Sequence, residues 1–432
     1  MNNLLILFLI SIFLTSCSLD KRTGLWSKSE KIKKEKKIIE VFKKESASQL
    51  EFNSDLEIKL PPRFTKNNII NRISNNTGRT KYNGNLKKIA KFKFSSINDF
   101  NEIEPDLIFY NDTIIFFDKK GSILKFNNLS KLIWKKNYYT KVEKKLRPKL
   151  FFSNKKNILI IVDSIAKYYA IDINNGNLLW SKNNSTPFNS QVKIYQNKFF
   201  VIDSENIIRC YSIKTGKEIW SLETDTSFIS SQKRLSLVIK NNTLYVNNSV
   251  GDVSAVNINS GSLIWQTPTQ SSMIYEDTFS LQTSDLTING NSLFFSNNRN
   301  EFFSIDSISG SLNWKQKINS NVRPTIFNDI IFTVTLEGFL TIIDSQSGNI
   351  IRITDIFNKF SKNKRKKIKP VGFILGSSNI YLTTDHGKIL IIDIKSGKTI
   401  SVKKIDNEKI SRPIILNKNL YIIKRNSIVQ LN

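Results

Sequence analysis

The stretch VNINSGSLIW, residues 256–265, contains the pattern that recurs along this chain. A polar turn with a glycine leads into a short apolar run that ends at a tryptophan, and an Asn or Asp precedes the glycine by four residues in most copies, with Ser212 in its place before Gly216. Four full copies end at Trp180, Trp220, Trp265 and Trp314, and weaker copies end at Trp134, Arg352 and Ser401. Successive copies are 38 to 49 residues apart, which is the spacing of β-propeller blades.

The residues of the repeat fit a hairpin followed by an interblade contact. An Asx side chain four residues before the glycine can bond the backbone of the turn, and the glycine can adopt a positive φ. These glycines are Gly176, Gly216, Gly261 and Gly310 in the full copies. The tryptophan that ends each run presents a broad face, which we expect to pack against the neighbouring blade.

The number of repeats predicts the number of blades. Two more alternating runs precede each motif, so each unit supplies four strands. Seven motifs are followed by residues 411–432, which supply three strands, and the alternating segment IAKFKF, residues 89–94, can supply the fourth. The sequence therefore predicts an all-β protein over residues 85–432. We expect an eight-bladed β-propeller of four-stranded antiparallel blades, with seven blades as the alternative.

The N-terminus has the pattern of a lipoprotein signal. Residues 1–16 hold an apolar run that is too short to span a bilayer as a helix. The tetrapeptide Leu14-Thr15-Ser16-Cys17 resembles a bacterial lipobox, which predicts cleavage before Cys17 and attachment of acyl chains such as palmitate to it. Ser18 in place of Asp favours the outer membrane, with the chain facing the periplasm. Residues 17–84 lack the repeat and are expected to form a flexible tether after the lipidated cysteine.

The chain is strongly basic, with 65 Lys and Arg against 36 Asp and Glu and a net charge of +29. Nucleic acid is the first partner that such a balance suggests. A secretion signal and the even spread of the charge argue against it, so no nucleic-acid partner is expected. Two dense basic runs, residues 28–44 and 362–369, can either rest on anionic lipid or be solvated.

No pattern of catalytic residues emerges from the sequence. Cys210 lies in an alternating run and is predicted to be a buried core residue, and lipidated Cys17 would leave it without a disulfide partner. The single histidine, His386, lies at a predicted hairpin tip. The sequence shows no phosphate loop, HExxH motif or nucleophile elbow. We therefore expect neither enzymatic activity nor a cofactor or metal.

Two segments between blades differ from the Lys-rich remainder. Residues 222–231 and 270–282 lack Lys and Arg and combine carboxylates with apolar side chains. An apolar cluster with a polar rim is typical of a protein interface. The predicted partner-binding residues are Phe228, Ile229, Met273, Tyr275, Phe279 and Leu281. The alternative is that these side chains fold back over the blade edges.

The repeat A-x-D-x-x-T/S-G-x-x-x-W resembles that of PQQ-type propellers, which occur in quinoprotein dehydrogenases and in the BamB family of outer-membrane assembly lipoproteins. The lipobox, the tether, the single propeller and the segment IKLPPRF, residues 58–64, resemble the BamB family. The resemblance implies a non-enzymatic, monomeric propeller within the β-barrel assembly machinery. It also implies binding to the POTRA domains of a BamA-like subunit through loops of the middle blades.

Two other functions remain open at this point. The chain can be a periplasmic lipoprotein that binds peptidoglycan, a polysaccharide or another envelope complex. A quinoprotein-type dehydrogenase is the more remote alternative, because it needs a cofactor cavity with Ca²⁺-binding carboxylates and often a pair of adjacent cysteines. This chain has no such pair.

Overall fold

The computed structural model describes residues 50–64, 73–75, 78–97, 99–100, 103–225, 233–269 and 281–432. The chain divides into two compact units, residues 1–45 and 46–432, and all the described residues belong to the second. Cys17 and the basic run 28–44 lie outside the described residues. None of the described helices is long and apolar enough to cross a membrane.

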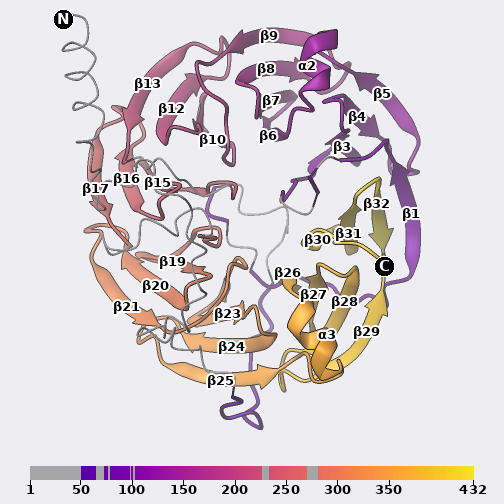
Figure 1. Ribbon diagram of the computed structural model, residues 1–432, viewed down its shortest axis with the longest axis vertical. Helices are drawn as coiled ribbons and strands as arrows, with labels where there is room; N and C mark the ends of the chain where they lie inside the picture. The colour runs from indigo at the N-terminus through magenta and orange to yellow at the C-terminus, as the bar shows by residue number, and fades with distance from the viewer. Residues whose placement is uncertain are drawn as a thin grey trace, which may run out of the picture. The chain divides into compact units, whose positions relative to one another are not determined.

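The second unit is an eight-bladed β-propeller, so the predicted fold is confirmed, with eight blades (Figure 1). Each blade is an antiparallel sheet of four strands, which run from the innermost strand to the outermost. Blade 1 comprises β2 (Ile108–Tyr110), β3 (Thr113–Phe117), β4 (Ile123–Phe126) and β5 (Leu132–Lys136). Blade 2 comprises β6 (Leu150–Lys155), β7 (Ile158–Asp163), β8 (Lys167–Asp172) and β9 (Leu178–Asn183). Blade 3 comprises β10 (Lys193–Tyr195), β11 (Lys198–Ile202), β12 (Ile207–Ser212) and β13 (Glu218–Glu223).

The remaining blades continue the same pattern around the ring. Blade 4 comprises β14 (Leu237–Lys240), β15 (Thr243–Asn247), β16 (Val253–Asn257) and β17 (Leu263–Thr267). Blade 5 comprises β18 (Thr287–Asn289), β19 (Ser292–Asn297), β20 (Glu301–Asp306) and β21 (Leu312–Gln316). Blade 6 comprises β22 (Thr325–Phe327), β23 (Ile330–Val334), β24 (Phe339–Asp344) and β25 (Ile350–Asp355). Blade 7 comprises β26 (Pro370–Leu375), β27 (Asn379–Thr384), β28 (Lys388–Asp393) and β29 (Thr399–Lys404).

Blade 8 closes the ring with strands from both ends of the propeller. The C-terminal strands β30 (Ile414–Leu416), β31 (Asn419–Lys424) and β32 (Ser427–Leu431) are joined by β1 (Lys88–Lys93). In the β1–β32 pair, Phe92 lies opposite Ile428 and its side chain is buried. The predicted closing strand is therefore confirmed. Pairing the two ends removes the open sheet edges that a linear array of blades would leave.

The antiparallel order defines two faces of the ring. We use "turn face" for the side with the hairpins between the first and second and between the third and fourth strands of each blade. We use "loop face" for the opposite side, where the outermost strand of one blade connects to the innermost strand of the next. Two short helices lie in such connections, α2 (Lys141–Lys145) before blade 2 and α3 (Lys362–Lys367) before blade 7.

In blades 1 to 5 the tryptophan of the repeat joins the blade to the next one. The indole N–H of Trp220 donates to the carbonyl of Ile258 at 3.0 Å, and that of Trp265 donates to Ser307 at 3.2 Å. Trp180 and Trp314 make the same bond, at 2.9 and 3.1 Å. Each ring lies over the repeat glycine of the next blade, so a Cβ added at Gly261 would lie 2.6 Å from Cδ2 of Trp220.

The glycine turns have the predicted geometry. Gly176, Gly216, Gly261 and Gly310 have φ values of +72°, +63°, +76° and +78°. At the turn that ends at Gly310, the carboxylate of Asp306 accepts hydrogen bonds from the backbone N–H groups of Ile308 and Ser309, at 3.0 and 2.8 Å. Gly310 itself donates to the carbonyl of Asp306 at 2.9 Å. Glycine is therefore needed at these positions for two reasons: the turn requires a positive φ, and the tryptophan ring leaves no room for a Cβ.

Arg352 replaces the tryptophan in blade 6 and makes an equivalent interblade contact. Its side chain is fully buried, and one guanidinium nitrogen donates to the carbonyl of Ile394 at 3.4 Å, the position that Ile258 holds in blade 4. The other terminal nitrogen donates to Leu56 at 2.7 Å and to Lys395. The substitution therefore retains the interblade bond and adds a contact to the N-terminal segment.

The N-terminal segment departs from the expected flexible tether where it is described. Phe52 and Ile353 exchange two backbone hydrogen bonds, at 3.1 and 2.8 Å, so residues around Phe52 add to the outer edge of β25. The N–H of Thr80 donates to Leu375 in β26 at 2.9 Å. Residues 50–58 and 78–84 thus belong to the folded unit, because backbone groups at the blade edges bond to them.

The contact between tryptophan and glycine leads to a stability prediction. We expect Gly261→Ala to lower the free energy of unfolding more than Gly290→Ala does. Gly290 also has a positive φ, of +53°, but nothing lies within 4 Å of an added Cβ, so its variant isolates the backbone strain of about 1 kcal/mol. Gly261→Ala adds overpacking against Trp220, at a further cost of about 1–3 kcal/mol. Urea denaturation of both variants measures the difference, and equal losses would contradict the interblade role of the glycine.

Candidate functional site

The two segments predicted to bind a partner connect consecutive blades on the loop face. Residues 222–231 begin in β13 and lead toward β14, and residues 270–282 lie between β17 and β18. Phe228, Ile229, Met273, Tyr275 and Phe279 lie outside the described residues. Leu281 is described and is 1 % exposed, so its side chain lies in the core and is not on the surface. The position of Leu281 therefore fits the alternative interpretation, in which the side chain packs against the blade and does not bind a partner.

The described ends of the two segments are held together by hydrogen bonds. The carbonyl of Asp225 accepts from the side-chain amide of Asn206 at 2.9 Å. Its carboxylate accepts from the amide of Gln266 at 2.6 Å, at the end of β17, from which the second segment departs. Thr269 is fixed in turn by a 2.7 Å bond to the carbonyl of Gly251. Two loops that start from bonded positions on adjacent blades can present one surface.

The second candidate site is a cavity at the axis of the ring. It has an empty volume of about 1080 Å³, which includes solvent at its mouth. The innermost strands β2, β6, β10, β26 and β30 all contribute to its wall, which places it where the blades converge. We call this space the central cavity.

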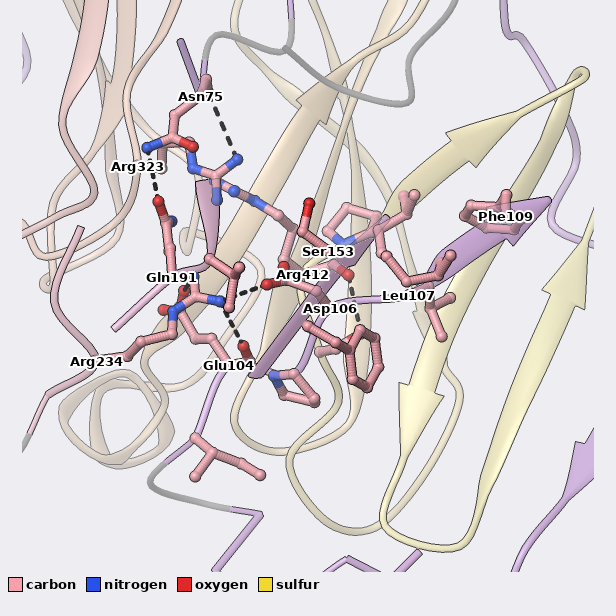
Figure 2. A pocket seen from close by; sticks show the side chains of 18 of the residues that line it. Asn75, Glu104, Asp106, Leu107, Phe109, Ser153, Gln191, Arg234, Arg323 and Arg412 are labelled. Carbon is pink, nitrogen blue, oxygen red and sulfur yellow. Dashed lines mark hydrogen bonds and ion pairs between the residues drawn. The ribbon is translucent and has the colours of Figure 1, made fainter. Parts of the chain in front are cut away.

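Charged side chains cluster on one part of the cavity wall (Figure 2). Five cations line it: Lys193, Arg234, Arg323, Lys409 and Arg412. Two carboxylates of the segment before β2, Glu104 and Asp106, also line it. Cations therefore outnumber carboxylates in this wall.

Arg234 and Arg323 are held by carboxylates. Arg234 donates to Asp106 at 2.7 Å and lies 3.4 Å from Asp285, while Nε of Arg323 donates to Asp285 at 2.9 Å. Burial alone would raise the pKa of Asp285, but Arg323 and Arg234 hold that pKa well below its usual range. Burial likewise acts to lower the pKa of Arg234, and Asp106 and Asp285 raise it above its usual value. Each of these two arginines thus has a fixed counter-ion.

Asn75 of the N-terminal segment closes one side of the cavity. It is 2 % exposed, and its amide donates to Gln191 at 3.1 Å and to the carbonyl of Leu286 at 3.0 Å, on blades 3 and 5. Its amide oxygen accepts from the ammonium group of Lys193. Figure 2 shows Asn75 beside Gln191 and Arg323. This one side chain bonds to several innermost strands, and so it ties the N-terminal segment to the axis.

Lys193 has an altered protonation equilibrium as a result of its position. Burial, together with the nearby charge of Arg323, lowers its pKa from 10.5 to about 7. A lysine that titrates near neutral pH is a signature of a desolvated site.

Sequence reasoning missed this cluster, although one signal was present. Arg-Pro occurs at residues 147–148, 323–324 and 412–413, shortly before the innermost strands β6, β22 and β30. Arg323 and Arg412 line the cavity, whereas Arg147 is exposed, so the dipeptide by itself is a weak signal. Arg234 precedes β14 without a proline. A comparison of the residues before each innermost strand would have brought these arginines together.

The remaining residues that the sequence analysis considered are a cysteine, a histidine and a basic run. Cys210 is fully buried, and burial raises the pKa of its thiol to about 12. His386 lies in the turn between β27 and β28, half exposed, with Nδ1 2.7 Å from the carboxylate of Asp385. The basic run 362–369 contains α3, whose helical residues are not buried. No group of three or more potential metal ligands occurs in the described part of the chain.

The repeat, its glycine–tryptophan contacts and the eight blades define a PQQ-like β-propeller. The sequence profile of the family described as outer membrane protein assembly factor BamB matches residues 119–354, more than half of the chain. The chain belongs to this family. No curated protein matches the chain.

Solved structures show the same fold at low sequence identity. BamB from Moraxella catarrhalis is 13 % identical, with a TM-score of 0.65, over 80 % of this chain and 100 % of that one. A europium-containing methanol dehydrogenase is 9 % identical, with a TM-score of 0.61, over 80 % of this chain and 86 % of that one. Quinohemoprotein alcohol dehydrogenase from Comamonas testosteroni is 9 % identical, with a TM-score of 0.59, over 81 % of this chain and 76 % of that one.

The lowered pKa of Lys193 predicts a pH dependence of stability. Between about pH 7 and 10.5 the unfolded chain holds a proton on this lysine that the folded chain has released. The contribution of Lys193 to the free energy of unfolding therefore increases as the pH rises from about 7 to 10.5. Below about pH 7 this increase is absent. We expect Lys193→Met to remove this contribution. Urea midpoints at pH 7 and pH 9 measure it, with Lys217→Met in an exposed turn of the same blade as the control. Identical pH slopes in the two variants would contradict the assignment.

Proposed function

We propose that the protein is a non-enzymatic scaffold lipoprotein of the outer-membrane β-barrel assembly machinery. The observation that carries this proposal is the family membership. The matched residues 119–354 include both segments predicted to bind a partner, residues 222–231 and 270–282. In the proposal Cys17 is the lipid attachment site, the propeller faces the periplasm, and the chain is a monomer within a larger complex.

The proposed contact is between residues 222–231 and 270–282 and the POTRA domains of a BamA-like subunit. Two features support it: both segments start on the loop face of adjacent blades, and Asp225 and Gln266 bond their described ends at 2.6 Å. Phe228 and Phe279 are the anchors in this proposal, with Ile229, Met273 and Tyr275 around them.

The orientation of the N-terminal segment is consistent with a lipid anchor. The side chain of Glu51 accepts a hydrogen bond from the N–H of Asp355, where β25 ends on the loop face. Asp355 is also bonded to Arg365 of α3 at 2.8 Å. The described chain therefore reaches the ring on the loop face, next to the basic helix and on the same side as the proposed partner segments.

The contact predicts the result of copurification. We expect the double variant Phe228→Lys and Phe279→Lys to lower recovery of a BamA-like subunit from solubilised membranes at least tenfold, because each charge replaces an apolar anchor. The matched control is Leu129→Lys with Ile308→Lys. These residues are 79 % and 70 % exposed and lie in hairpins of the turn face. Far-UV circular dichroism checks that both variants are folded.

Two outcomes would contradict this contact. One is unchanged recovery of the subunit with the phenylalanine variant. The other is recovery of peptidoglycan or another envelope polysaccharide by the wild type without assembly subunits, which would favour the alternative of an envelope-polymer binder.

The lipid anchor has a separate test. We expect Cys17→Ser to abolish incorporation of a palmitate analogue and to release the protein from the membrane fraction, since the attachment thiol is lost. Cys210→Ala is the control, because this thiol is buried in blade 3 and should not be acylated. Labelling of the Cys17 variant equal to that of the wild type would refute the anchor.

A further inference from the structure

We propose that the central cavity binds a small organic carboxylate, with Arg412 as the cation that receives it. The inference rests on the geometry of the cavity and goes beyond the proposed scaffold role. It is independent of the loop-face contact, which lies on other residues.

Arg412 is a partly buried cation that makes no ion pair within 4 Å in the described part of the chain. Its Nε and Nη1 atoms have almost no solvent contact, and neither donates to any acceptor in the described part of the chain. Burial and the nearby charge of Arg323 lower its pKa to about 9, against the opposing effect of Asp285 and Glu104, so the group is still protonated at neutral pH. Buried N–H groups without acceptors are unfavourable, because they lose hydration and gain no hydrogen bond in return. An anion bound in the cavity would supply the missing acceptors.

The other cations of the cavity wall have protein acceptors. Arg323 donates to Asp285 at 2.9 Å, and Arg234 donates to Asp106 at 2.7 Å. Lys409 donates to the carbonyl of Ile103 at 3.3 Å. Lys193 donates to the amide oxygen of Asn75, a neutral partner. Arg412 is therefore the member of this group whose Nε and Nη1 atoms find no acceptor among the described residues, while Asp285 and Glu104 act on it only at longer range. Lys193 is a second donor.

The cavity also has an apolar side. Leu107 and Phe109 of the segment that enters blade 1 line it, and Figure 2 shows both on the side away from Arg234 and Asn75. Val371, Pro413 and Ile414 line it as well. A ligand pocket usually combines such apolar walls with a few convergent polar groups.

The chemistry of the walls selects the class of ligand. One guanidinium with free donors matches one negative charge, and the apolar side matches a hydrocarbon or aromatic body next to it. A phosphate dianion would bring two charges and no apolar surface. Glu104 and Asp106 at the same wall repel any anion, and they repel a dianion more strongly than a monocarboxylate. These features favour a monocarboxylate with an apolar body.

The test uses the purified full-length chain and three probes at constant ionic strength. Benzoate has both features of the proposed ligand, inorganic phosphate has charge alone, and benzyl alcohol has the ring alone. We expect benzoate to raise the melting temperature saturably and the other two probes to have no such effect. Isothermal titration calorimetry gives the affinity for benzoate.

Arg412→Met separates binding from a structural role. We expect it to weaken benzoate binding at least tenfold and to leave the ligand-free melting temperature equal or higher, because replacing buried N–H groups that lack acceptors with an apolar side chain removes a cost. Arg425→Gln, at an arginine whose side chain is 61 % exposed and paired with Glu408, is the charge-matched control and should retain binding. The proposal is overturned by the absence of a saturable shift, by an equal shift with phosphate, by unchanged benzoate affinity in Arg412→Met, or by a lower ligand-free melting temperature in that variant.

Discussion

The contact between a tryptophan and the glycine of the next blade is the constraint on which the ring depends. The indole lies so close to Gly261 that a Cβ there would be 2.6 Å from the ring of Trp220, and the indole N–H bonds a carbonyl three residues before that glycine. One residue pair thus sets both the spacing and the orientation of adjacent blades. The contact occurs at five successive junctions, from Trp134 with Gly176 to Trp314 with Gly348, and Arg352 takes its place against Gly397.

Blade 6 shows how the repeat is altered to hold the N-terminal segment. Arg352 keeps the bond to the next blade that tryptophan makes elsewhere, and its second nitrogen bonds the carbonyl of Leu56. From there the chain leads to Asn75, which bonds several innermost strands at the axis. A segment without any repeat is thereby part of the propeller. Polar groups that the blades leave open, at an outer edge and at the axis, provide its binding sites.

Much of the fold was predictable because its signals are local. The Asx-Gly turn and the terminal tryptophan identify each blade, and the alternation in IAKFKF identifies the strand that completes blade 8. The central cavity was not predicted. Its arginines lie in different blades, with Arg234 and Arg412 far apart in sequence, and each stands before an innermost strand outside the repeat motif. The burial of Leu281 was missed because an apolar residue in a polar segment suits either an interface or the core.

The sequence by itself determined the propeller repeat and the turns between its strands, since these depend on residues within one repeat. A count of strands favoured eight blades over seven and identified the strand that closes the ring. Only the tertiary structure decided the charge balance at the axis, where cations and carboxylates from separate blades converge on one cavity. The physical reason is that Coulomb and desolvation energies depend on distances between strands, which the order of residues along the chain does not contain.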